Sequence, residues 1–245
     1  DPLARARTRL LRLGGLTSTD LPDVALVPDW VPDELVTTIP IEQFLAWGQR
    51  RPPVWLRAMP PERATEVAAE LVRLGFPAIP NSRLAGAVSV AAPRVAPQVL
   101  SGLKSGMVEV QDAASQAIVA AGAPQPGERW WDVCAGAGGK TLQLAVAVAP
   151  QGFVLATDVR QEPLTELRRR SSRCELRNFQ IEHWDGKSIR KQWDGAFAGV
   201  LVDAPCTGSG TWRRNPDGRW RARQEQIADA AARQRRILEI AAKAV

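Results

Sequence analysis

A glycine-rich loop near the middle of the chain contains residues that can hold a charged or nucleotide-like ligand. It follows an apolar segment and reads Asp132-Val133-Cys134-Ala135-Gly136-Ala137-Gly138-Gly139-Lys140-Thr141. Glycines at a strand-to-helix turn allow tight backbone angles and let a ligand approach the main chain, and the helix that follows offers free N–H groups. The loop therefore predicts a binding site for a nucleotide-like ligand.

Spacing separates three classes of ligand for this loop. A phosphate-binding Walker A loop requires glycine five residues before Gly139, where this chain has Cys134. A dinucleotide fingerprint that begins at Gly136 requires glycine or alanine at the position of Thr141. Both patterns are disfavoured, so the loop favours a ligand that has no pyrophosphate.

Two aspartates after later predicted strands match an adenosine-containing ligand of this kind. Asp158 lies 20 residues after Gly138, where a carboxylate can accept hydrogen bonds from both ribose hydroxyls. Asp185 follows the next strand and can accept a hydrogen bond from an adenine amino group. S-adenosylmethionine meets this description, although each aspartate alone is also compatible with a helix cap or a solvated loop.

A second loop with chemical potential reads Asp203-Ala204-Pro205-Cys206-Thr207-Gly208-Ser209-Gly210-Thr211-Trp212 and follows another apolar strand. Residues at the carboxyl end of a parallel strand face the crevice where ligands bind. The proline stiffens the turn, and the two glycines keep the surface open to a flat substrate. Asp203 and Cys206 are therefore candidate catalytic residues, and the alternative is a cysteine that only fills space.

The elements that must position these two loops alternate from Met107 onward. A short strand at 108–111 and a helix capped by Asp112 come first. Strands are then predicted at 130–133, 153–157, 179–183 and 200–202, with helices at 141–148, 163–173 and 225–244. Apolar strands that alternate with helices predict a parallel, doubly wound α/β sheet.

Residues 38–105 show a different pattern, in which helices alternate with short strands. Helices are predicted at 41–50 and 62–74 and strands at 54–57, 78–79 and 87–90, as in a small α+β domain with a ferredoxin-like or RRM-like sheet. Its basic residues predict an RNA path together with Trp47 and Trp55; they are Arg50, Arg51, Arg57, Arg63, Arg73 and Arg83. The alternative places both tryptophans in the core and the arginines in solvent. Residues 1–37 read as a helical tail and linker.

The composition favours a polyanionic partner and disfavours several classes of enzyme. Lysine and arginine number 32 against 26 acidic residues, a net charge of +6, although an arginine-rich composition also follows from some genomes. The single histidine, His183, argues against Ser-His-Asp hydrolysis. The three cysteines are too widely spaced for a metal site, so no metal is predicted. With no long apolar run or signal peptide, the expected location is the cytoplasm, away from membranes.

The two loops resemble motifs of the Nol/Nop/Sun (RsmB-like) family of S-adenosylmethionine-dependent RNA cytosine-C5 methyltransferases. The glycine-rich loop is similar to the family's cofactor loop, usually Asp-x-Cys-Ala-Ala-Pro-Gly-Gly-Lys-Thr, with Gly136 and Ala137 in place of Ala-Pro. The loop that begins at Asp203 is similar to the family's Asp-Ala-Pro-Cys motif. Residues 110–116 and 213–217 resemble further signatures of the bacterial ribosomal-RNA branch. The resemblance covers residues 38–245 and implies a class I methyltransferase (Rossmann-like) domain over 106–245.

The resemblance also implies a reaction, the transfer of a methyl group from S-adenosylmethionine to carbon 5 of a cytosine in RNA, in ribosomal RNA for this branch. Carbon 5 is a weak nucleophile, so a cysteine thiolate first adds to carbon 6. The family pattern assigns stabilisation of this adduct at ring N3 to Asp203, and proton removal and enzyme release to Cys206. The target base must leave its stack, which favours single-stranded or loop RNA. The implied cofactor-binding residues are Cys134, Ala135, Gly136, Ala137, Gly138, Gly139, Lys140, Asp158, Asp185 and Asp203.

One part of the family pattern has no counterpart in this sequence. The family's attacking thiol lies on a fifth strand, in a Thr-Cys-Ser motif, whereas this chain ends at Val245 within or just after the preceding helix. We therefore expect a truncated or partly represented protein that lacks the C-terminal strands of the sheet. The alternatives are a catalytically inactive RNA-binding or assembly module of the same fold, or attack by Cys206 itself. The target nucleotide and the oligomeric state do not follow from the sequence.

Overall fold

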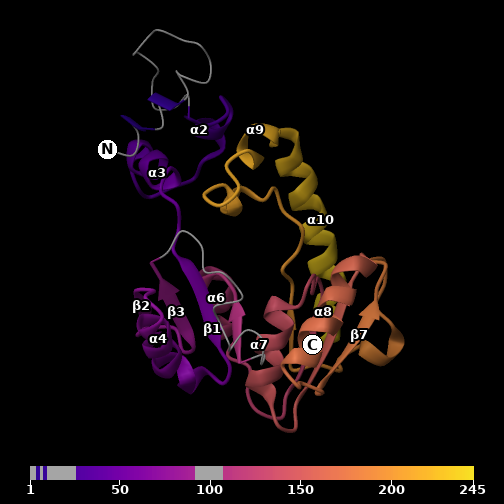
Figure 1. Ribbon diagram of the computed structural model, residues 1–245. Helices are drawn as coiled ribbons and strands as arrows, with labels where there is room; N and C mark the ends of the chain where they lie inside the picture. The colour runs from indigo at the N-terminus through magenta and orange to yellow at the C-terminus, as the bar shows by residue number, and fades with distance from the viewer. Residues whose placement is uncertain (1–3, 6–7, 10–25, 92–106) are drawn as a thin grey trace. The chain divides into compact units, whose positions relative to one another are not determined.

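The computed structural model describes residues 4–5, 8–9, 26–91 and 107–245, so most of the predicted helical tail lies outside the described residues. The chain divides into two compact units (Figure 1). The first runs to Pro52 and also contains Pro205–Arg233, and the second contains Pro53–Ala204 and Gln234–Val245. The domain ranges predicted from the sequence, 1–37, 38–105 and 106–245, cut across these units and stay predictions.

The first unit is built from short helices around a small apolar core. Its described helices are α2 (Val31–Glu34), α3 (Ile41–Gly48), η5 (Ser209–Thr211), α9 (Gly218–Arg221) and the beginning of α10 (Glu225–Ala241). The buried side chains of the core are Leu26, Val27, Val31, Leu45 and Trp212. The guanidinium of Arg219 is buried among them and donates to the carbonyls of Leu26 (2.9 Å) and Gly48 (3.3 Å), so two distant parts of the chain are joined within this unit.

The second unit contains an antiparallel sheet of four strands. They are β1 (Val54–Ala58), β2 (Ala78–Pro80), β3 (Ala87–Val90) and β4 (Val108–Val110), in the order β2-β3-β1-β4. The first strand is thus internal, as in the predicted ferredoxin-like sheet. Helix α4 (Ala64–Arg73), preceded by the turn η2 (Pro61–Arg63), covers one face through Val67, Ala68 and Leu71. The predicted boundary at residue 105 separates β4 from this sheet, whereas β4 pairs with β1 in the structure.

The other face of the antiparallel sheet carries charged residues. Side chains alternate along a strand, so Leu56 and Ala58 face α4 while Arg57 points to the opposite side. Arg57 lies directly across from Glu109 of β4, and each residue is only 3% exposed. The prediction that Arg57 lines an RNA path is therefore wrong, because its guanidinium is buried inside the protein.

The second sheet of this unit is parallel, and it confirms the predicted α/β fold. Its strands are β5 (Arg129–Asp132), β6 (Phe153–Asp158), β7 (Phe179–His183) and β8 (Gly199–Leu201), in the order β7-β6-β5-β8. The chain moves outward from β5 to β7 and then returns to the other side of β5. Strand order therefore reverses between β5 and β8, which is where α/β sheets bind ligands.

Helices cover both faces of the parallel sheet. Helices α6 (Ala113–Ala121), α7 (Gly139–Val148) and α8 (Gln161–Arg173) bury side chains such as Val119, Leu144 and Leu167 against one face. The end of α10 buries Ile237 against the other face, where Trp131 is surrounded by Trp184, Trp193 and Phe197. The short turns η4 (Lys191–Trp193) and η6 (Ala242–Ala244) complete the unit. None of the described helices combines the length and apolar character that a membrane span requires.

Candidate cofactor and substrate site

The loop between β5 and α7 has a backbone that only glycine can supply at its tightest point. Gly138 is the N-cap of α7 and has φ +84°, in the left-handed region. A Cβ atom there would lie 2.1 Å from Cδ1 of Leu167, a fully buried side chain of α8. Close packing of α8 against the turn therefore requires glycine at this position, independently of any ligand.

Asp158, at the end of β6, holds the loop from one side. Its buried carboxylate accepts hydrogen bonds from the backbone N–H of Gly136 (2.9 Å) and from the backbone N–H (2.9 Å) and Nε (3.1 Å) of Arg160. Burial raises the pKa of Asp158, but these hydrogen bonds outweigh it and the pKa is lowered below its ordinary value. The Arg160 side chain is 65% exposed, so ribose hydroxyls can replace it on an ionised carboxylate.

Asp132, at the end of β5, holds the beginning of α7. The hydroxyl of Thr141 donates to Asp132 Oδ2 at 2.6 Å, and no described residue donates to Oδ1. Burial raises the pKa of this carboxyl to about 7, although the Thr141 hydrogen bond opposes the shift. The sequence predicted no role for Asp132 or Thr141. Burial raises the pKa of Asp132, and burial cannot be seen in the loop motif.

An ion pair joins the two loops that the sequence singled out. Nζ of Lys140 lies 2.5 Å from Oδ2 of Asp203, which follows β8. The lysine side chain is 13% exposed and the aspartate 49%, so the pair stands at the boundary between protein and solvent. The turns after β5 and β8 therefore lie next to each other at the carboxyl edge of the parallel sheet.

Asp185 lies beyond the end of β7. It is exposed, and its Oδ1 accepts a hydrogen bond from the backbone N–H of Lys187 at 3.0 Å. It lines a cavity of about 320 Å³ with His183, Trp184, Ser188 and Arg190. The backbone N–H of Trp184 donates to the carbonyl of Asp158 (3.3 Å), so the segments that carry the two aspartates are in contact.

The cysteines of the two loops differ in their environments. Cys134 is half-buried, and burial together with the nearby aspartates raises its pKa to about 12, so its thiol is protonated near neutral pH. Cys206 is exposed and its Sγ accepts from the backbone N–H of Gly208 at 3.4 Å; it belongs to the first compact unit, whereas Asp203 belongs to the second. In the part of the chain that the structure describes, no group of three or more His, Cys, Asp or Glu side chains is arranged to hold a metal ion.

One further side chain contacts the cofactor loop and was not predicted from the sequence. Nη1 of Arg170, on α8, donates to the carbonyl of Ala137 at 2.7 Å. Arg170 follows the buried residues Leu164 and Leu167 at helical spacing, which indicates an inward-facing position. Nothing in the sequence separates it from the neighbouring Arg168 and Arg169 as a loop contact.

Comparison with known proteins identifies relatives of this chain. Residues 119–245 match the family model described as 16S rRNA methyltransferase RsmB/F. The Ribosomal RNA small subunit methyltransferase B of Serratia proteamaculans (strain 568) is 35% identical over 219 residues, which cover 87% of this chain and 50% of that protein. The chain therefore spans about half the length of this curated relative.

Two solved structures are similar over nearly all of the chain. The crystal structure of PH0851 has a TM-score of 0.83 and 28% identity, covering 89% of this chain and 50% of the other. A methyltransferase homolog protein from Pyrococcus horikoshii has a TM-score of 0.68 and 25% identity, covering 96% and 71%. With the family model matched over more than half of its residues and with a Rossmann-like sheet, this chain belongs to the RsmB/F family of 16S rRNA methyltransferases.

Proposed function

We propose that this chain forms the cofactor site and part of the substrate site of an enzyme that transfers a methyl group from S-adenosylmethionine to carbon 5 of a cytosine in RNA, ribosomal RNA in particular. The observation that carries the proposal is the ion pair between Lys140 and Asp203, which joins a cofactor loop to a substrate-side loop. Membership of the RsmB/F family supports the same chemistry.

The residues around the loop match the parts of S-adenosylmethionine. The buried, ionised carboxylate of Asp158 would accept the ribose hydroxyls, and Asp185 in its neighbouring cavity would accept the adenine amino group. The N–H groups at the beginning of α7, around Gly139, have no intrahelical acceptor and suit the cofactor's carboxylate. The cofactor supplies an electrophilic methyl group on its sulfonium.

On the substrate side, Asp203 and Cys206 take the roles that the family pattern assigns. In the family pattern the cysteine of the Thr-Cys-Ser motif adds as a thiolate to carbon 6 of the cytosine. Asp203, held by the Lys140 ammonium, stabilises this adduct at ring N3. Carbon 5 of this adduct would then receive the methyl group that bound S-adenosylmethionine supplies. Cys206 assists removal of the carbon 5 proton, after which the bond between carbon 6 and the thiol breaks. The half-buried, protonated Cys134 is unsuited to either role.

The partner in this proposal is single-stranded or loop RNA. A net charge of +6 supports a polyanionic partner, and ribosomal RNA as substrate favours a cytoplasmic location. The exposed ring of Trp47, in the first unit, has the guanidinium of Arg213 3.9 Å from its centroid. Aromatic and arginine planes of this kind suit stacking with an unpaired base.

Calorimetry with S-adenosylhomocysteine tests the cofactor site. We expect the full chain to bind it and the Asp158→Ala variant to bind about 10- to 100-fold more weakly, because hydrogen bonds to a charged group are lost. Asp194→Ala, which changes an exposed aspartate, is the control and should bind as the native chain does.

A methyl-transfer assay on the complete enzyme tests the reaction. Label from methyl-labelled cofactor should reach carbon 5 of cytosine in RNA, and transfer to adenine or to protein would contradict the proposal. Absence of any heat with S-adenosylhomocysteine, combined with RNA binding that weakens steeply with salt, would instead identify a binding module without methyltransferase activity.

A further inference from the structure

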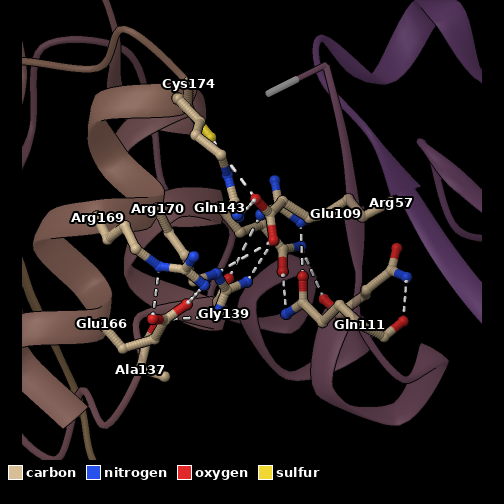
Figure 2. Close-up of polar contacts among 12 residues, drawn as sticks. Arg57, Glu109, Gln111, Ala137, Gly139, Gln143, Glu166, Arg169, Arg170 and Cys174 are labelled. Carbon is tan, nitrogen blue, oxygen red and sulfur yellow. Dashed lines mark hydrogen bonds and ion pairs between the residues drawn. The ribbon is translucent and has the colours of Figure 1, made fainter. Parts of the chain in front are cut away.

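A cluster of buried and partly buried charges connects the antiparallel sheet to the cofactor loop (Figure 2). Its centre is Glu109 of β4. Oε2 of Glu109 accepts hydrogen bonds from Nη2 (2.6 Å) and Nε (3.1 Å) of Arg170, and Oε1 accepts one from Nη2 of Arg173 (3.1 Å). Both arginines come from α8, so ion pairs connect a strand of the antiparallel sheet to a helix that covers the parallel sheet.

The guanidinium of Arg170 makes a second contact on its remaining side. While Nη2 and Nε face Glu109, Nη1 donates to the carbonyl of Ala137 in the cofactor loop. A planar guanidinium donates from three nitrogens in fixed directions, whereas an ammonium group has three rotatable donors on a single nitrogen. Arg170 therefore fixes the main chain of the loop relative to Glu109, because it contacts both.

Arg57 makes a parallel connection from β1. Its Nε donates to Oε1 of Gln111 at 2.5 Å, and its Nη2 lies 3.4 Å from the carbonyl of Gly139. Gln111 also donates to Gln143 of α7 at 3.1 Å (Figure 2). The antiparallel sheet thus reaches the loop at a second carbonyl, two residues beyond the first.

Joining two sheets through these charged contacts carries an unfavourable desolvation free energy. Burying a carboxylate and guanidinium groups carries a desolvation cost that apolar side chains of similar size would avoid. Unlike apolar side chains, the charged groups orient the loop through directional hydrogen bonds. The arginines donate to loop carbonyls on one side, while Asp158 accepts from the N–H of Gly136. These contacts hold the loop at Gly136, Ala137 and Gly139.

We propose that Glu109 and Arg170 are positioning residues for the cofactor site, so that the antiparallel sheet helps to set the shape of the S-adenosylmethionine loop through the Arg170 guanidinium. This inference rests on the proposed function, in which the loop binds S-adenosylmethionine. It gives the antiparallel sheet a role in cofactor binding, separate from any contact that it makes with RNA.

Two conservative variants test this role by calorimetry with S-adenosylhomocysteine on the full chain. Arg170→Lys keeps the positive charge but replaces three donor nitrogens with one, so it cannot reproduce the two hydrogen bonds to Glu109 together with the one to the Ala137 carbonyl. We expect binding to weaken about 10-fold or more. Glu109→Gln keeps the shape but removes the charge that orients Arg170, and we expect a similar loss. The double variant should lose little more than either single variant, because both act through one contact.

The neighbouring arginine supplies a matched control. Arg169→Lys alters an exposed pair with Glu166 on the same helix (Figure 2) and should leave binding unchanged. Thermal unfolding of each variant separates positioning from stability. A lower melting temperature with unchanged affinity, measured while the variant is folded, would overturn the inference and leave the proposed function standing. A native chain that does not bind S-adenosylhomocysteine would overturn both.

Discussion

The cofactor loop and the substrate-side loop follow neighbouring strands but are held in different ways. The first is fixed from several sides by buried groups, including Asp132, Asp158 and the Arg170 guanidinium. In the second, Cys206 and Gly208 are in contact with each other, and Thr211 donates back to the carbonyl of Gly208 at 2.8 Å. Asp203, at the beginning of this second loop, forms the ion pair with Lys140 of the first.

The difference separates two kinds of requirement on a sequence. In the cofactor loop the fold itself needs the buried residues, such as Asp132 and Gly138, because a change there disturbs buried neighbours. In the substrate-side loop the exposed Cys206 is not needed for packing, and under the proposed function its role is chemical. Substitutions in the cofactor loop should therefore lower the free energy of unfolding more than substitutions in the substrate-side loop.

The largest difference should come from the buried carboxyl of Asp132. Because its folded pKa, about 7, lies above the ordinary value of 3.8, the folded state retains a proton that the unfolded chain releases. The protonated Asp132 carboxyl therefore contributes fully to the free energy of unfolding below about pH 4. This contribution is lost as the pH rises to 7, and the loss is roughly 4 kcal/mol at most. Urea unfolding across this range should show a smaller loss in Asp132→Asn. Equal slopes in variant and native chain would contradict the shift.

Thr141→Val sharpens the same measurement. The Thr141 hydroxyl lowers the pKa of Asp132, so its removal should make the loss of stability with pH larger.

Two glycines in the left-handed region give the next comparison. Gly138→Ala should destabilise the protein by about 2–4 kcal/mol, since it combines backbone strain with overpacking against Leu167. Gly208 has a similar φ of +75°, but its nearest neighbour, Thr211 Oγ1, would lie 4.0 Å from a Cβ atom. Gly208→Ala should therefore cost about 1 kcal/mol. Denaturant unfolding of both variants measures this, and equal costs would show that packing around Gly138 relaxes freely.

The smallest effect on stability should come from Cys206. Cys206→Ser should change the free energy of unfolding by less than about 0.5 kcal/mol and leave S-adenosylhomocysteine binding intact, since the side chain is exposed. Under the proposed function it should still abolish normal turnover. Cys134→Ser, which places a hydroxyl in a half-buried position, should cost about 1–2 kcal/mol. A large loss of stability in Cys206→Ser would mean that this cysteine is structural.

Several features of this protein followed from the sequence alone. Alternating apolar segments predicted each strand of the parallel sheet to within a residue or two, because burial on both faces requires continuous apolar runs. The same applies to the cap of α6, where Asp112 accepts from the N–H of Ala114. The glycine loop and the Asp-Ala-Pro-Cys motif were recognisable because local backbone geometry and chemistry restrict which residues can stand there.

Other features depend on which distant residues the fold brings together. Arg57 read as one of several basic residues, and only the pairing of β1 with β4 placed it opposite Glu109 in the interior. The Lys140–Asp203 pair joins residues 63 positions apart through the adjacency of β5 and β8. Helical spacing indicates an inward-facing position for Arg170, but only the packing of α8 brought it to the Ala137 carbonyl and Glu109. Residue types and local spacing determined the elements and motifs, whereas burial and long-range pairing, which depend on the whole chain, decided which charges hold the cofactor loop.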